Sequence, residues 1–495
     1  MIITELQQLY AAHPNVEGMY RLLQDNSVRH LYCSGLCASA ASLFSSVLIQ
    51  RVECPFVFIL GDLEEAGYFY HDLTQILGTE QVLFFPSSFR RAIKYGQKDA
   101  ANEILRTEVL SRLQKVEEGL RVVTYPDALA EKVVSRKELG DKTLKLHLGE
   151  KVDMDFVTEV LRSYSFEYVD YVYEPGQYAV RGSIIDVFSF SSEFPFRIDF
   201  FGDEVESIRT FEVESQLSKE KKENIVIVPD LSHSLEQRGN GGMVSFLDFL
   251  QPDTLLAMKD FLWLRERIQT VHDEALTAQA IAAREAEENG LISLDGKLID
   301  GGEFTLRALD FRRIEFGTKP TGTPDATVTF NTTAQPIFHK NFDLVAESFH
   351  DYLSRNYALY ICSDSLKQTE RIRAIFEDRG DNISFTSVER TLHEGFADDA
   401  LRLCIFTDHQ LFDRFHKYNL KSDKARSGKV ALSLKELNQF TPGDYVVHTD
   451  HGVGRFTGLV RIPNGDTTQE VMRLVYQNDD VVFVSIHSLH KVSKY

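Results

Sequence analysis

Short apolar runs alternate with stretches of helical pattern along residues 1–130 of this chain. Strands that alternate with helices are typical of a parallel sheet covered by helices. The runs are HLYCSGL at 30–36, FVFILG at 56–61, QVLFFP at 81–86 and RVVTYP at 121–126. The pattern therefore predicts an α/β domain that begins at residue 1.

The pattern changes to strict alternation between Tyr178 and Phe211. A strand sends successive side chains to opposite faces, so this alternation predicts strands that carry charges at fixed points. If this stretch begins as one continuous strand, its side chains fall into two sets on opposite faces. One face takes Arg181, Ser183 and Ile185, and the other takes Val180, Ile184 and Asp186. Residues 131–215 are thus predicted to form a β-rich α+β module inserted into the first domain.

Arg197 and Asp199 flank Ile198, so the two charged side chains share one face of the predicted strand and Ile198 points to the other. The result is a stiff patch of mixed charge. Two interpretations stay open. The patch is either a recognition surface or a solvated sheet face with compensating charges, because ion pairs on a surface are ordinary.

The remaining pattern predicts four further segments. Residues 216–329 continue the first domain and end in a connector rich in Gly, Pro and Thr. Residues 330–416 alternate strand and helix patterns, which predicts a second α/β domain of unknown role. Residues 417–440 are polar and predict a linker. Residues 441–495 are rich in Val, Tyr and Phe with tight turns, which predicts a small antiparallel β-barrel.

Composition limits the classes of function. The formal net charge is −20 over 495 residues, which opposes attraction to the phosphates of DNA. No apolar run approaches the roughly 18 residues that cross a bilayer, and the start of the chain has no signal-peptide pattern, so we expect no membrane association and a cytoplasmic protein. The five cysteines lie mostly in apolar segments and complete no metal-ligand pattern. We therefore expect reduced thiols and no metal site.

The turn after the first predicted strand lies where a phosphate-binding loop would lie. Such a loop needs Gly-x-x-x-x-Gly-Lys-Ser/Thr, because the lysine reaches the phosphates and the hydroxyl binds Mg²⁺. Here the run from Gly35 through Ala38 and Ser39 contains no lysine. Asp408-His409 follows an apolar strand like a Walker B carboxylate, but without a partner loop we interpret it as an ordinary strand-end turn. We predict a degenerate, non-binding loop and no catalytic residue.

The segments RGSIIDVF at 181–188 and RIDFFGDEVESIR at 197–209 resemble the small inserted domain of the repair protein UvrB. They are still more similar to its counterpart in the bacterial transcription-repair coupling factor family (Mfd). The resemblance covers the whole chain as the N-terminal region of that family, and is sharpest at Arg181–Arg209 and Gly443–Tyr495. It implies that the first domain is a degenerate helicase-like sheet, as the missing lysine indicates; UvrB differs in this respect.

In that family the inserted module is the docking surface for UvrA. Carried over position by position, the resemblance implies five UvrA-binding residues. They are Arg162, Arg181, Phe188, Arg197 and Asp199. Arginine suits such a surface because its planar guanidinium pairs with carboxylates in a bidentate manner and stacks on aromatic rings.

The C-terminal module resembles the Tudor-like (SH3-like) RNA-polymerase-interacting domain of the family, which is related to the CarD regulators. There an exposed strand edge pairs with the polymerase β subunit by main-chain hydrogen bonds. The resemblance points to the strand beside the Asn464-Gly465 turn, and its candidate residues are Leu459, Val460, Arg461 and Ile462. A buried strand with a purely structural role is the alternative, because alternating Val and Ile fill small barrels well.

The resemblance implies an adaptor that binds stalled RNA polymerase and recruits UvrA to begin nucleotide excision repair. It implies no cofactor in this chain, and ATP, Mg²⁺ and most DNA contacts in a translocase motor C-terminal to residue 495. We expect a monomer. The alternatives are an ATP-dependent UvrB-like helicase that recognises damage, and a CarD-like transcription regulator that is indifferent to UvrA.

Overall fold

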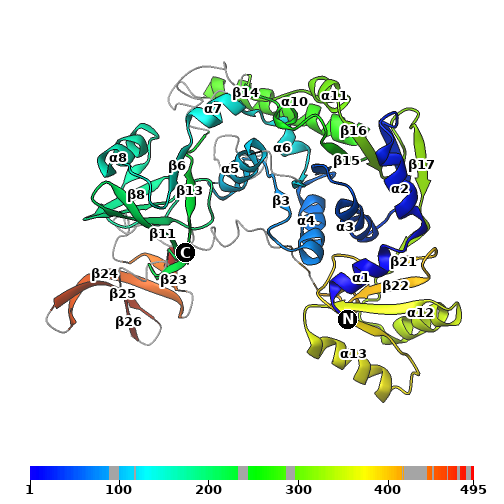
Figure 1. Ribbon diagram of the computed structural model, residues 1–495. Helices are drawn as coiled ribbons and strands as arrows, with labels where there is room; N and C mark the ends of the chain where they lie inside the picture. The colour runs from blue at the N-terminus through cyan, green and yellow to red at the C-terminus, as the bar shows by residue number, and fades with distance from the viewer. Residues whose placement is uncertain are drawn as a thin grey trace. The chain divides into compact units, whose positions relative to one another are not determined.

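A computed structural model describes most of the chain (Figure 1). The described residues are 1–88, 100–115, 119–213, 215–231, 243–285, 296–414, 416, 418, 443–448, 451–464, 467–476, 480–485 and 492–494. They form two compact units. The first unit contains Met1–Asp141 and Leu231–Leu420, and the second contains Lys142–Asp230 and Lys421–Tyr495.

The first unit contains a seven-stranded sheet in the order β17-β1-β16-β15-β2-β4-β3, in which every pairing is parallel. The multidomain α/β class predicted from the sequence is therefore confirmed. Late strands pair with early ones, as β16 does with β1, because the chain leaves this domain and returns to it. The strands are β1 (His30–Ser34), β2 (Phe56–Ile59), β3 (Leu83–Phe84), β4 (Arg121–Thr124), β15 (Leu255–Lys259), β16 (Arg312–Phe316) and β17 (Ala326–Thr329).

Helices surround this sheet, and a short two-stranded ladder of β5 with β14 accompanies them. Local sequence sets their ends: the Asp62 carboxylate accepts the Glu65 N–H (2.9 Å) at the start of α4, and Gly78, at φ 95°, follows its end. The elements are α1 (Ile3–Tyr10), α2 (Pro14–Gln24), α3 (Ala40–Arg51), α4 (Leu63–Leu77), α5 (Ala100–Gln114), α6 (Pro126–Ala130), β5 (Val133–Val134), α7 (Arg136–Asp141), β14 (Met243–Val244), η1 (Phe246–Phe249), α10 (Phe261–Glu285) and α11 (Gly301–Ala308).

A second sheet in the same unit has the order β18-β21-β22-β19-β20. Its centre is parallel, since β19 pairs in parallel with both β20 and β22. Phe349, Ile361 and Phe406 are among its buried core residues. The elements are β18 (Thr332–Ala334), α12 (Phe342–Ser354), β19 (Ala358–Ser363), α13 (Leu366–Asp378), β20 (Thr386–Glu389), β21 (Phe396–Asp398), β22 (Leu403–Thr407) and α14 (Asp408–Leu411).

In the second unit, the inserted module is a six-stranded sheet in the order β12-β11-β10-β9-β8-β7, with helix α8 packed on one face through Val157 and Leu161. A ladder of β6 with β13 belongs to the same unit. The sequence analysis placed residues 224–227 in the first domain, whereas β13 pairs with β6 in the second unit. The elements are β6 (Leu144–His147), α8 (Met154–Ser163), β7 (Glu167–Tyr168), β8 (Gln177–Arg181), β9 (Ile184–Val187), β10 (Phe196–Phe201), β11 (Glu204–Phe211), β12 (Ser218–Lys221) and β13 (Asn224–Ile227).

The stretch that begins at Tyr178 is a hairpin of β8 and β9, so the two faces assigned on the condition of one continuous strand are wrong. Gly182 adopts φ 62° in the turn, a conformation that costs glycine little, and Arg181 then pairs with Ile184. Because the two residues of the turn break the alternation, Arg181 and Asp186 come to the same face. The prediction for β10 is confirmed, since Ile198 is fully buried while Arg197 and Asp199 lie half-buried on the other face.

The C-terminal residues form a five-stranded antiparallel sheet in the order β26-β25-β24-β23-β27. A closed barrel stays a prediction. Most of the predicted linker, residues 417–440, lies outside the described residues. The strands are β23 (Tyr445–His448), β24 (Gly452–Asn464), β25 (Thr467–Val475), β26 (Val481–Ser485) and β27 (Val492–Lys494).

All five cysteines are free thiols, and Cys33, Cys362 and Cys404 are buried. None of the helices in the described part of the chain is long and apolar enough to cross a membrane.

Candidate partner-binding surfaces

One face of the six-stranded sheet carries charges in adjacent strands. Asp186 of β9 lies opposite Arg197 of β10, which lies opposite Arg209 of β11. The other face is apolar and buries residues such as Ile185 and Ile198. We call the first side the charged face; its charged side chains are Arg181, Asp186, Arg197, Asp199 and Arg209.

Asp186 is the centre of the charged face. Its carboxylate is fully buried and accepts two hydrogen bonds from Arg197, Nε to Oδ1 at 2.7 Å and Nη2 to Oδ2 at 2.8 Å. Arg181 also pairs with Oδ2 of Asp186. The hydrogen bond and the nearby negative charge of Asp186 raise the pKa of Arg197. One buried carboxylate thus fixes two guanidinium groups on the surface.

Aromatic rings hold the same guanidinium groups from a second side. The Arg181 guanidinium lies 5.0 Å from the centre of the Tyr171 ring, and that of Arg197 lies 4.5 Å from the centre of the Phe211 ring. Such contacts are worth roughly 0.5–1 kcal/mol at exposed sites. The arginines are therefore preorganised, which lowers the entropy lost when a partner binds.

The structure does not bring all five predicted UvrA-binding residues together. Arg181, Arg197 and Asp199 share the charged face, and Asp199 accepts a hydrogen bond from Ser183 Oγ (3.0 Å). Arg162 lies on α8, which packs on the apolar side of the sheet, and its Nε donates to the Tyr178 hydroxyl (3.1 Å). These placements divide the predicted set between two sides of the sheet.

Phe188 is only 3% exposed and packs in a small core with Val172, Ala179 and Phe211. Its ring therefore lies beneath the surface, and a part for Phe188 in UvrA binding stays a prediction. Phe211 also lies beneath Arg197, so the core that contains Phe188 supports the charged face from below.

Sequence reasoning missed Asp186 as the anchor, Tyr171 as the aromatic support of Arg181, and Phe201 as an exposed ring. Phe201 is 77% exposed at the end of β10 and follows Asp199 by two positions. The same two-residue period that placed Arg197 and Asp199 could have identified it. The pairing of Asp186 with Arg181 could not be predicted without knowledge of the turn at Gly182.

In the C-terminal module, the predicted polymerase-binding residues lie in β24. Residues 452–455 of β24 pair with β23, and residues 455–464 pair with β25 apart from a bulge near Gly458. Within the described strands, nothing pairs with the second edge of β24 beyond Phe456. Leu459 is exposed and Val460 half-buried; for Arg461 and Ile462 the structure describes the strand but not the side chains. A free edge is the feature that strand addition requires.

The turn between β1 and α3 borders a cavity of about 400 Å³ at the carboxyl end of the parallel sheet. Carboxylates dominate its polar lining, and Lys259, which also lines it, pairs with Glu65. The acidic residues are Asp62, Glu64, Glu65, Asp72 and Glu394. Such a lining repels the phosphates of a nucleotide.

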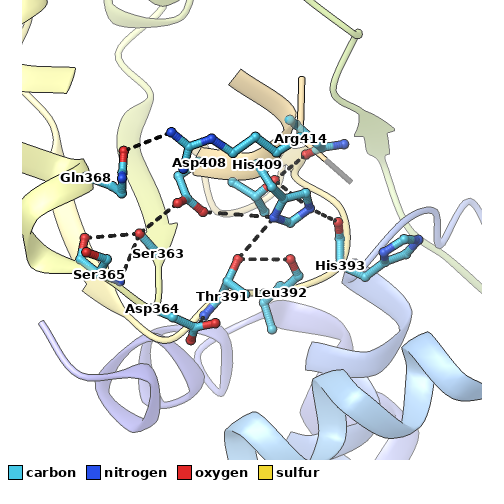
Figure 2. Close-up of polar contacts among 12 residues, drawn as sticks. Ser363, Asp364, Ser365, Gln368, Thr391, Leu392, His393, Asp408, His409 and Arg414 are labelled. Atoms are coloured by element: carbon cyan, nitrogen blue, oxygen red, sulfur yellow. Dashed lines mark hydrogen bonds and ion pairs between the residues drawn. The ribbon is translucent and has the colours of Figure 1, made fainter. Parts of the chain in front are cut away.

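Polar side chains also gather where β19 and β22 of the second sheet end (Figure 2). Ser363 Oγ donates to Oδ2 of Asp408 (3.0 Å), and His409 Nε2 donates to the carbonyl oxygen of His393 (2.7 Å). Burial raises the pKa of Asp408. Asp408 begins the short helix α14. These contacts agree with an ordinary strand-end turn.

Two family models match the regions of the chain that contain these candidate surfaces. A family model described as the UvrB interaction domain matches residues 144–233, and one described as the CarD-like/TRCF RID domain matches residues 440–495. The chain therefore carries two interaction modules.

Whole-chain comparison gives a more specific result. The chain is 23% identical over 542 residues to a transcription-repair-coupling factor of Staphylococcus aureus (strain bovine RF122 / ET3-1), covering 93% of this chain and 45% of that protein. It is 22% identical over 534 residues to the transcription-repair-coupling factor of Bacillus subtilis (strain 168), with the same coverage. The chain thus spans about half the length of these curated relatives. The predicted resemblance to the N-terminal region of the transcription-repair coupling factors is confirmed.

Proposed function

We propose that this chain is an adaptor that binds UvrA through the charged face and the RNA polymerase β subunit through the free edge of β24. Both interaction modules lie on one chain, at 144–233 and 440–495, and this observation carries the proposal. An adaptor of this kind joins a stalled polymerase to nucleotide excision repair. The relatives' shared name, transcription-repair-coupling factor, supports this role.

We further infer that the chain neither binds nor hydrolyses ATP. The turn at Gly35 lacks a lysine, the adjacent cavity is acidic, and Lys259 already pairs with Glu65. ATP, Mg²⁺ and most DNA contacts belong in this proposal to a motor outside the chain, and the chain acts as a monomer in the cytoplasm. The net charge of −20 supports weak intrinsic DNA binding. ATP hydrolysis by the purified chain, stimulated by DNA, would instead favour a UvrB-like helicase.

Arg181→Ala should weaken capture of purified UvrA about tenfold and leave polymerase capture unchanged. The Arg181 side chain is 37% exposed, and it presents donors that Asp186 and Tyr171 hold in place. Binding of each partner by surface-immobilised chain measures both effects. Undiminished UvrA binding would remove the charged face from the proposal, and a wild-type chain that captured polymerase but not UvrA would favour a CarD-like regulator.

Ile462→Arg should weaken polymerase capture and leave UvrA capture unchanged. The substitution adds a charge to the strand whose outer edge is proposed to pair with the partner, and distant surfaces act independently. Arg473→Lys in β25, which keeps the charge of an exposed residue, is the matched control. Loss of both partners in the Ile462 variant would indicate misfolding, and full polymerase binding would exclude this edge.

A further inference from the structure

A loop of the second α/β domain reaches into the first. Residues 391–395 lie between β20 and β21, and we call them the bridging loop. The backbone N–H of His393 donates to Asp72 Oδ1 (2.7 Å), and the N–H of Glu394 donates to Ser39 Oγ (3.0 Å). Asp72 and Ser39 are each 2% exposed, so partly buried contacts join the loop to α4 and to the residue before α3.

A second segment engages the turn that precedes α3. The hydroxyl of Thr332 donates to the carbonyl oxygen of Gly35 (2.6 Å) and accepts the N–H of Cys37 (3.0 Å). The carbonyl oxygen of Phe330 lies 2.0 Å from the position that a Cβ atom on Gly35 would occupy. With φ at +79°, Gly35 thus meets both a steric and a conformational requirement for glycine. The shape of the turn at Gly35 therefore accommodates the segment that contains Phe330 and Thr332.

The bridging loop is fixed from its own side as well. His409 donates from Nε2 to the carbonyl oxygen of His393 (2.7 Å), a contact drawn in Figure 2. The N–H of Gly395 donates to Oε1 of Gln410 (2.8 Å). The loop therefore enters the first domain as a preformed element.

The bridging loop lies at the position where open parallel sheets commonly bind ligands. In open parallel sheets, ligands bind in the crevice at the carboxyl ends of the strands, and the N–H groups of the βα turn and helix start receive phosphates. Here Thr332 accepts the N–H of Cys37 from this turn, and the Ser39 hydroxyl before α3 accepts the N–H of Glu394. The His393 ring also stacks on Tyr68 of α4, with ring centres 3.4 Å apart.

We propose that the second α/β domain serves as a built-in occupant of the former nucleotide site. The bridging loop and Thr332 pair with Asp72, the Ser39 hydroxyl and the turn at Gly35 and Cys37, and these contacts fasten the two α/β domains together. This gives residues 330–416 a role that is separate from either partner surface. It also removes the site's groups from any nucleotide, independently of the missing lysine.

Hydrogen exchange of the full chain, followed by mass spectrometry, tests the contact. Ser39→Ala removes the acceptor of Glu394, and the Ser39 side chain does not cap α3. Amides of the bridging loop should exchange about tenfold faster, the loss expected for one hydrogen bond. Asp72→Ala should have a larger effect. Peptides from β22 should keep wild-type rates, and Ser354→Ala, whose exposed hydroxyl donates within its own helix, should change nothing.

Unchanged exchange of the bridging loop in both the Ser39 and Asp72 variants would overturn the proposal. Saturating ADP with Mg²⁺ provides a separate test on the wild-type chain, in which loop protection should stay unchanged and no nucleotide should bind. Nucleotide bound beside a protected loop would also overturn it. Nucleotide that bound and deprotected the loop would instead support the occupied site and contradict the proposed absence of nucleotide binding.

Discussion

Replacing Asp186 with asparagine should lower the free energy of unfolding of the inserted module by about 3 kcal/mol and reduce UvrA capture more than Arg181→Ala does. Asp186 is fully buried and pairs with both Arg181 and Arg197. The neutral amide leaves both guanidinium groups without their counter-charge. The loss is costly because the Arg197 side chain is only 16% exposed. Denaturant unfolding measures the first effect, and binding of purified UvrA measures the second.

Asp199→Asn is the matched control for stability. Asp199 carries the same carboxylate on the same face, but it is partly exposed and lies 3.9 Å from Arg209. Its loss should change the unfolding free energy by less than about 0.5 kcal/mol, as is usual for surface pairs. Polymerase capture should survive in both variants. Equal stability of the Asp186 and Asp199 variants would contradict the central role of Asp186.

The second large effect is loss of stability of the first unit in acid. Burial lowers the pKa of His71 and of His409 to about 4, and that of His393 to about 3. Their neighbour His416 lowers these values further, while Asp364 raises those of His71 and His409 in part. In an unfolded chain histidine titrates near 6.5. Between pH 6.5 and 4 these histidines are therefore protonated in the unfolded chain but neutral in the folded chain. The free energy of unfolding consequently decreases as the pH decreases.

Asp72 opposes this trend, because burial raises its pKa to about 6. It takes up a proton in the folded chain at a pH where the unfolded carboxylate stays ionised, so its contribution to stability improves as pH falls from 7 towards 4. The histidines outweigh it. Between pH 7 and pH 5 the three histidines together remove about 5 to 6 kcal/mol, Asp72 offsets about 1 kcal/mol, and the net loss is about 4 to 5 kcal/mol.

Thermal unfolding at pH 7 and pH 5 measures this loss, and His71→Phe tests its origin. A phenyl ring does not titrate, so the variant should lose about 2 kcal/mol less than the wild type between these values. His350→Gln, at an exposed position of α12, is the control and should keep the wild-type pH dependence. Equal melting at both pH values in the wild type would contradict the assignment of neutral buried histidines.

Much of the architecture could be predicted from the sequence because it depends on the spacing of apolar and polar residues within short segments. Alternating strands and helices predicted the parallel sheet, and the two-residue period around Ile198 placed Arg197 and Asp199 on one face. The period failed at Gly182, where a turn of two residues reversed the chain. It also gave no warning that Phe188 is buried, because Phe188 follows Asp186 by two positions and the alternation assigns both to one face.

The sequence by itself determined the α/β class, the two interaction modules and the missing phosphate-binding lysine, since each depends on residues that are close together in the chain. Only the tertiary structure decided that Asp186 anchors two arginines and that Asp72 and Ser39 receive the bridging loop. Those last contacts join residues 321 and 355 positions apart. Buried polar groups must find partners, but which distant backbone supplies them is settled only when the domains pack.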